Sequence, residues 1–337
     1  MDRQVSRPPL LLMMGALLLL LLVAMVLALR IGPVALGSHD VWQALWHNDG
    51  SMSAMVVREL RVPRLILAAL VGSALALSGA ILQGLFRNPL ADPGLIGVSS
   101  GAALGAVAVI VMASWWLDPV PVWLLPIMAF IGALLVTLVV WRIATRQSGT
   151  DVSLLLLAGI AINALAMALT GLLVYAADDA QLRELTFWNL GSVAQATPDQ
   201  IAVTLPCLLL VWLTIPWLAR PLNALLLGEA VAGHLGFPVE RVKRIAVFSV
   251  ALSVGAAVSV SGMIGFVGLV APHLVRLTLG ADHRWLLPAS AVLGALLLIA
   301  ADTIARTIVA PAELPIGLVM ALMGGPFFLF LLMQKRR

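Results

Sequence analysis

Long apolar stretches, interrupted only by short charged or Pro- and Gly-rich segments, run along almost the whole chain. A helix needs about 20 mainly apolar residues to cross the hydrocarbon core of a bilayer. Only 11% of the 337 residues are charged, less than half the roughly 25% that is typical of soluble domains. The ten candidate spans are 9–29, 63–86, 94–113, 119–141, 152–176, 200–218, 244–261, 263–279, 285–305 and 314–333. The sequence therefore excludes a water-soluble, disordered or fibrous chain and predicts an all-α polytopic membrane protein, in one transmembrane domain over 1–337.

The distribution of Lys and Arg residues predicts the orientation of the chain. Ten spans place both termini on one side, and cytoplasmic termini put fourteen of the twenty Lys and Arg residues inside. Such an excess is typical of the cytoplasmic loops of membrane proteins. We therefore expect both termini in the cytoplasm, and we expect the basic loops to set orientation rather than to bind nucleic acid. The six exceptions, on the outside, are Arg30, Arg58, Arg61, Arg64, Arg183 and Arg306.

Two hydrophilic segments are longer than simple turns. Residues 31–60 form an outer loop that contains two Trp and two His residues. Residues 219–243 form the largest inner loop, and their pattern predicts two short helices that meet near Gly228. Apolar side chains among polar ones on the water side of a membrane fit two uses. One is a docking surface for another protein, and the other is an interfacial helix lying on lipid.

The composition argues against catalysis and metal binding by this chain. Cys207 is the only cysteine, which excludes an intramolecular disulfide and a cysteine metal cluster. The five His residues show no metal-ligand spacing. Lys243 and Lys335, the only lysines, are each followed by Arg, so the chain lacks the Gly-Lys-Ser/Thr of a P-loop. We therefore expect a chain that is not an enzyme and binds no cofactor; an ATP site that drives it must belong to another subunit.

One stretch, Gly97-Val-Ser-Ser-Gly101, matches the nucleophile-elbow pattern of serine hydrolases. That motif needs a strand before it, a helix after it and a nearby His, and the sequence offers none of this context. Gly97, Gly101 and Gly105 are spaced four residues apart, which places them on one helix face. Small residues on a face let another helix approach closely in a membrane. We predict a helix-packing role for these three glycines.

Ion-coupled transporters usually carry carboxylates or His residues near the middle of the bilayer. The clearest acid within a predicted span is Asp302, near the outer end of the ninth span, and Arg306 lies one turn away to pair with it. This position gives little support to a proton relay. Charge-poor helices rich in Gly and Met instead indicate a path for a large, partly apolar solute.

Several motifs, in order along almost the whole chain, resemble those of the FecCD-type permeases. These permeases are the membrane subunits of ABC importers for ferric siderophores, haem and vitamin B12. The matching stretches are Arg61-Val-Pro-Arg64-Leu, the run from Leu77 to Gly97 with Asn88-Pro-Leu-Ala-Asp-Pro-Gly94, Leu227-Gly-Glu-Ala-Val-Ala-Gly-His-Leu-Gly236, Gly265-Phe-Val-Gly-Leu-Val-Ala-Pro-His273, Asp282-His-Arg284 and Ala312-Glu-Leu-Pro-Ile-Gly317.

The resemblance implies a vitamin B12 permease-like (type II ABC importer) fold in the bacterial inner membrane. It implies a homodimer with the translocation path between the copies, two cytoplasmic ABC ATPase subunits that hold ATP and Mg, and a periplasmic solute-binding protein. It also implies that segment 219–243 docks on the ATPase and that Arg61, Arg64 and Arg306 face acidic residues of the binding protein. The residues expected to couple the chain to the ATPase are Leu227, Gly228, Glu229, Ala230, Leu235 and Gly236.

The resemblance further implies a cytoplasmic gate at Asp151, Val152 and Ser153. Asp151 fits a second use equally well, as the N-cap of the following helix. The segments 179–192 and 93–105 resemble haem and iron permeases, so we expect haem to be the transported solute. A ferric siderophore or a corrinoid is the alternative within the family, and an ion-coupled secondary transporter is the alternative from a different class.

Overall fold

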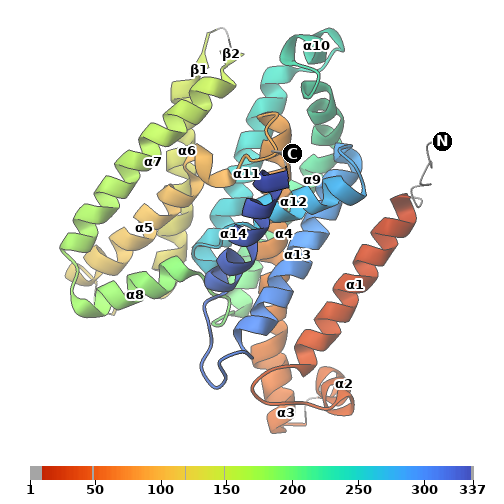
Figure 1. The fold of residues 1–337 in the computed structure, drawn as a ribbon. Coiled ribbons are helices and arrows are strands. Elements are labelled where there is room, and N and C mark those ends of the chain that lie inside the picture. The colour runs from red at the N-terminus through yellow and green to blue at the C-terminus, as the bar shows by residue number, and fades with distance from the viewer. Residues whose placement is uncertain (1–9, 48, 118, 148, 335–337) are drawn as a thin grey trace.

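The computed structural model describes residues 10–47, 49–117, 119–147 and 149–334, and the described chain is almost entirely helical (Figure 1). Each of the ten predicted spans contains one apolar helix, so the predicted all-α membrane fold is confirmed. Pro9, where the first predicted span begins, and the terminal cations Arg3, Arg7, Lys335, Arg336 and Arg337 lie outside the described residues. The ten helices are α1 (Leu10–Arg30), α4 (Val62–Leu85), α5 (Val98–Met112), α6 (Leu124–Ala144), α7 (Val152–Tyr175), α9 (Pro198–Leu225), α11 (Val239–Ser261), α12 (Val267–Thr278), α13 (His283–Ala305) and α14 (Ile316–Gln334).

Two of these helices are too short to cross a bilayer alone. α5 has 15 residues and α12 has 12, which gives roughly 22 Å and 18 Å at 1.5 Å per residue, against a hydrocarbon core of about 30 Å. Irregular backbone precedes both: residues 86–97, which include the 3₁₀ helix η2 (Pro93–Ile96), and residues 262–266. Irregular backbone at membrane depth is tolerated only where protein or a water-filled cavity surrounds it. These two segments therefore indicate the functional interior.

The remaining elements lie toward the two ends of the helical bundle (Figure 1). The short helix α10 and the hairpin β1–β2 lie at one end, toward which α1 begins and α14 ends. Helices α2 and α3 and the loop before α14 lie at the opposite end. These elements are α2 (Ser38–Trp46), α3 (Met52–Met55), the π-helix η1 (Val56–Arg61), the 3₁₀ helix η3 (Ala113–Trp115), β1 (Thr145–Arg146), β2 (Gly149–Thr150), α8 (Asp179–Leu190) and α10 (Glu229–His234).

Glycine contacts hold the centre of the bundle together. α4 and α11 are the most buried of the long helices, with α13 next, whereas few residues of α1, α7 and α9 are buried. A Cβ atom on Gly72 would overlap the carbonyl oxygen of Gly294 in α13, and one on Gly79 would overlap that of Gly268 in α12. The backbones therefore approach as closely as small residues allow in membrane helices.

Of the three glycines predicted to share one helix face, Gly101 and Gly105 lie on α5 and pack against α6. A Cβ atom on Gly101 would overlap the carbonyl oxygen of Gly132, and one on Gly105 would overlap that of Met128. Gly97 precedes the helix as its N-cap, with φ = 85°, a left-handed conformation that favours glycine. Gly101 and Gly105 therefore allow the close α5–α6 contact, as predicted, whereas Gly97 begins the helix.

The inner loop differs from the expectation in one respect. Two short helices were expected to meet near Gly228, but the first of them is the end of α9, which continues to Leu225 across Pro216 and Pro221. The second is α10, which begins directly after Gly228 (φ = 112°). Neighbouring helices can satisfy the backbone groups that proline frees in a membrane helix, so proline does not end α9 there.

Candidate functional site

Three arginines at the α2–α3 end of the bundle lie inside the protein. Arg61, Arg64 and Arg306 are 5%, 8% and 4% exposed. Arg64 from α4 donates from Nε to Asp302 (2.8 Å) and from Nη1 to both oxygens of Glu313 (2.8 and 2.9 Å). Arg306 approaches the same Asp302 at 3.8 Å. A buried charge is tolerated when it is paired in this way.

Backbone carbonyls accept hydrogen bonds from the other two arginines. Arg61 donates to the carbonyl oxygens of Leu29 (2.6 Å), Arg30 (3.1 Å) and Val34, and Arg306 donates to that of Ala28. The arginines therefore tie the end of α1 to α4, α13 and the loop before α14. The structure brings all three to one end of the molecule, as the docking hypothesis requires, but with guanidinium groups engaged internally. Their contact with a binding protein stays a prediction.

A second charged cluster lies at the opposite end, around Lys243. This α11 residue is 2% exposed, and its Nζ donates to Glu229 of α10 (2.6 Å), to Glu240 (3.1 Å) and to the carbonyl oxygen of Thr150 (2.5 Å). Glu240 in turn accepts the backbone N–H of Thr150 at 2.8 Å. One ammonium group therefore joins the expected docking helix, α11 and the hairpin β1–β2. We call Lys243, Glu229, Glu240 and Thr150 the lysine cluster.

The expected gate residues follow directly after that hairpin. Asp151 is the N-cap of α7, since its carboxylate accepts the backbone N–H groups of Ser153 (2.7 Å) and Leu154 (3.1 Å). Val152 is the first residue of the helix. The structure therefore confirms Asp151 as an N-cap. A gating role for these residues stays a prediction. Thr150 connects these residues to the lysine cluster. The sequence did not indicate this connection.

The expected docking residues present an apolar surface at the same end. Leu227 is 67% exposed and Leu235 is 59% exposed, and Ala230 is exposed between them. Gly228 and Gly236 flank α10 with φ values of 112° and 86°. Ala232 is fully buried and anchors the helix. Exposed leucines at this position fit a docking surface or contact with lipid, so docking on the ATPase stays a prediction.

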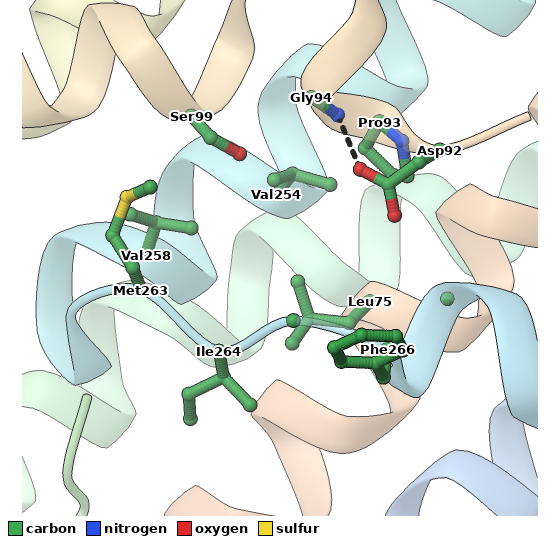
Figure 2. A pocket seen from close by; sticks show the side chains of 12 residues that line it. Leu75, Asp92, Pro93, Gly94, Ser99, Val254, Val258, Met263, Ile264 and Phe266 are labelled. Atoms are coloured by element: carbon green, nitrogen blue, oxygen red, sulfur yellow. Dashed lines mark hydrogen bonds between the residues drawn. The ribbon is translucent and has the colours of Figure 1, made fainter. Parts of the chain in front are cut away.

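A cavity of about 230 Å³ lies between the two irregular segments that precede α5 and α12 (Figure 2). Asp92 and Ser99 lie on one side of it, and Met263, Ile264 and Phe266 lie on the other. Asp92 accepts the backbone N–H of Gly94 at 2.8 Å and is the N-cap of η2. Apart from this capping acid, the lining residues are apolar or small, a lining that suits an apolar solute.

Sequence reasoning did not single out Asp92 as an acid within the membrane. The available signal was Asp92-Pro-Gly94, because Asp before Pro at the first helical position is a helix start. In the described residues no group of three or more His, Cys, Asp or Glu side chains could hold a metal ion. The candidate site therefore has three parts: the cavity beside Asp92, the buried arginines at one end and the lysine cluster at the other.

The comparisons with known proteins agree with this architecture. The chain is 45% identical over 321 residues to the hemin transport system permease protein HmuU of Yersinia pestis, covering 93% of each chain. It is 41% identical over 312 residues to the vitamin B12 import system permease protein BtuC of Citrobacter koseri, again covering 93% of each. A solved structure described as an inward-facing conformation of a metal-chelate type ABC transporter matches with a TM-score of 0.85 and 31% identity, covering 96% of this chain and 99% of that one. Residues 20–334 match the FecCD transport family. With its multi-pass helical bundle, the chain belongs to the FecCD transport family of ABC importer permeases.

Proposed function

We propose that this chain is the permease subunit that moves haem from the periplasm into the cytoplasm, powered by a separate ATPase. The observation that carries the choice of haem is the 45% identity to HmuU over 93% of both chains. Membership in a family of ABC importer permeases leaves the ion-coupled alternative without support.

A corrinoid is the second candidate, because BtuC relatives reach 41–43% identity. The two solutes are distinguished by reconstituting the chain with its ATPase and adding binding protein loaded with haem or with cobalamin. Haem-loaded protein is expected to stimulate ATP hydrolysis. If only the cobalamin-loaded binding protein stimulates ATP hydrolysis, the solute is a corrinoid and not haem.

The proposed assembly contains two copies of this chain, two cytoplasmic ATPase subunits that hold ATP and Mg, and a periplasmic binding protein, in the bacterial inner membrane. Exposed apolar side chains on α7 and α14, such as Leu157 (63%) and Leu322 (74%), give a surface that can pack against the second copy or lipid. Both termini are assigned to the cytoplasm, on the side of α10 and the hairpin β1–β2.

The lysine cluster supports a route from the ATPase to the gate. A subunit docked on Leu227 and Leu235 would contact α10, whose Glu229 bonds Lys243. Lys243 also bonds the carbonyl of Thr150, next to the N-cap of α7. A displacement of α10 therefore changes the bonds that hold the hairpin. Proteins use charged networks of this kind as two-state elements.

Replacing Leu227 by Asp is expected to prevent copurification of the ATPase, because it places a charge on an exposed apolar contact without touching the buried anchor Ala232. Copurification from detergent measures this directly. Gly228→Trp is a poorer test, since φ = 112° strains any side chain there. Arg142→Asp, an exposed change at the end of α6, is the control and should copurify normally. Normal copurification of Leu227→Asp would show that this segment is not the dock.

Cysteines placed at position 151 or 153 are expected to crosslink across the dimer in one nucleotide state only. The parent for this test carries Cys207→Ser, which removes the only native thiol. Position 153 is the more informative, because Asp151→Cys also removes the α7 N-cap, a loss worth about 1 kcal/mol. Crosslinks are read on gels with and without ATP. Equal crosslinking in every state, or none in any, would remove the gate assignment.

A further inference from the structure

A second cavity, of about 220 Å³, lies at the α10 end of the bundle. It lies where the end of α4 meets the region around the end of α12 and the start of α13, beside the end of α9. Its polar lining consists of Gln83, Arg87, Arg276 and His283, and Leu226 borders it from the docking segment. We call it the basic cavity.

The charge of the basic cavity is unbalanced. Within the described chain, neither Arg87 nor Arg276 has a carboxylate within ion-pair distance, and no residue that lines the cavity is acidic. Asp282, the acid next to His283, is not among the lining residues, and its carboxylate accepts from Asn223 Nδ2 (2.6 Å) and from the backbone N–H of Arg284 (3.0 Å). A cavity with two guanidinium groups and no counter-charge attracts an anion.

Two buried nitrogens in the lining have no hydrogen-bond partner within the described residues: Nη1 of Arg276 and Nε2 of His283. Asn223 Oδ1 accepts from the backbone N–H of His283 (2.9 Å) and lies 2.7 Å from its Nδ1. Because this oxygen can only accept, Nδ1 carries the proton and Nε2 is an acceptor, so the donor without a partner in the lining is Nη1 of Arg276. His283 is 1% exposed. A buried guanidinium nitrogen without a partner is costly, and a bound oxyanion would remove that cost.

We propose that the basic cavity binds a single phosphate group, either free phosphate or the headgroup of an anionic lipid. Arginine forks match the tetrahedral oxygens of phosphate, and both sources meet this end of the protein if it is cytoplasmic. Arg87 also reaches the docking segment, since its Nη1 lies 4.0 Å from where a Cβ atom of Gly228 would be. The basic cavity therefore lies beside the residue that precedes α10.

The test is the melting temperature of the purified chain in detergent, followed by the fluorescence of its ten Trp residues. Inorganic phosphate is titrated against chloride at equal ionic strength. We expect a saturable rise in Tm for the parent. The control is Arg284→Met, which changes an exposed arginine on the same side of the protein and should show the same rise. In Arg276→Met the apparent affinity should fall roughly tenfold or more, because a hydrogen bond to a charged group is lost.

A second arm identifies the source of the phosphate group. Micelles containing phosphatidylglycerol are compared with micelles containing phosphatidylcholine. If the ligand is a lipid headgroup, phosphatidylglycerol raises the Tm of the parent and of Arg284→Met but not of Arg276→Met, and free phosphate has no effect. Arg87→Met, a change at an exposed side chain, repeats the comparison if Arg276→Met fails to fold. Equal responses in all variants, or no response to either ligand, would overturn the proposal.

Discussion

Replacing Asp302 by Ala is expected to remove most of the folded protein from the membrane. Asp302 is 3% exposed and is the shared partner of Arg64 and Arg306. Its loss leaves two buried cations with less compensation, and breaking a buried pair costs about 3–5 kcal/mol, a large part of a total stability of roughly 5–15 kcal/mol. The yield of monodisperse protein and its Tm measure the effect.

The control for this experiment is Glu184→Ala, an acid exposed on α8, which should leave both quantities close to those of the parent. A Tm of Asp302→Ala equal to that of the control would contradict the account of the buried arginines. The same burial bears on binding-protein docking. Reversing Arg61 or Arg306 to Glu would break internal bonds to α1, so a loss of docking in such variants has to be corrected for a loss of folded protein.

Replacing Lys243 by Met is expected to separate ATP hydrolysis from transport. Met keeps the buried volume but removes the bonds to Glu229 and to the carbonyl of Thr150. The loss of hydrogen bonds to a charged group costs about 1.5–3 kcal/mol, so transport per ATP should fall roughly tenfold or more. Because the docking leucines are unchanged, the ATPase should still copurify.

Two further variants distinguish coupling from simple destabilisation. Arg241→Met changes an exposed neighbour and should transport as the parent does, while Lys243→Arg keeps a positive donor and should restore part of the coupling. Uptake and ATP hydrolysis are measured in the same proteoliposomes. If Lys243→Met transports with the ratio of the parent, or loses uptake and ATPase binding together, the lysine cluster does not transmit motion.

The sequence predicted the membrane-spanning helices well because length and hydrophobicity alone determine where a chain can cross a bilayer. Each predicted span contains a helix, including α12, only 12 residues long. The end of α9 was misplaced because a proline has a different effect in a packed membrane helix from its effect in water. The helices α2 and α8 are short and mix apolar with polar residues, so length and hydrophobicity gave no comparable signal for them, whereas α10 was expected as the second short helix of the inner loop.

The candidate site was less predictable, because its contacts join residues that are distant in sequence. Arg64 and Asp302 are 238 residues apart, and Lys243 and Thr150 are 93 apart. From sequence, Lys243 was one of many cations in an inner loop, whereas in the structure it is buried with three bonds. The pairing of Arg306 with Asp302 was predictable because the two residues lie one helical turn apart.

We propose that a partner ATPase, and not an ion gradient, drives solute through this chain. Haem uptake is measured in proteoliposomes that hold the chain with or without its ATPase. We expect uptake only when ATPase, ATP and loaded binding protein are all present. Concentrative uptake by the chain alone, driven by a proton or sodium gradient, would contradict it.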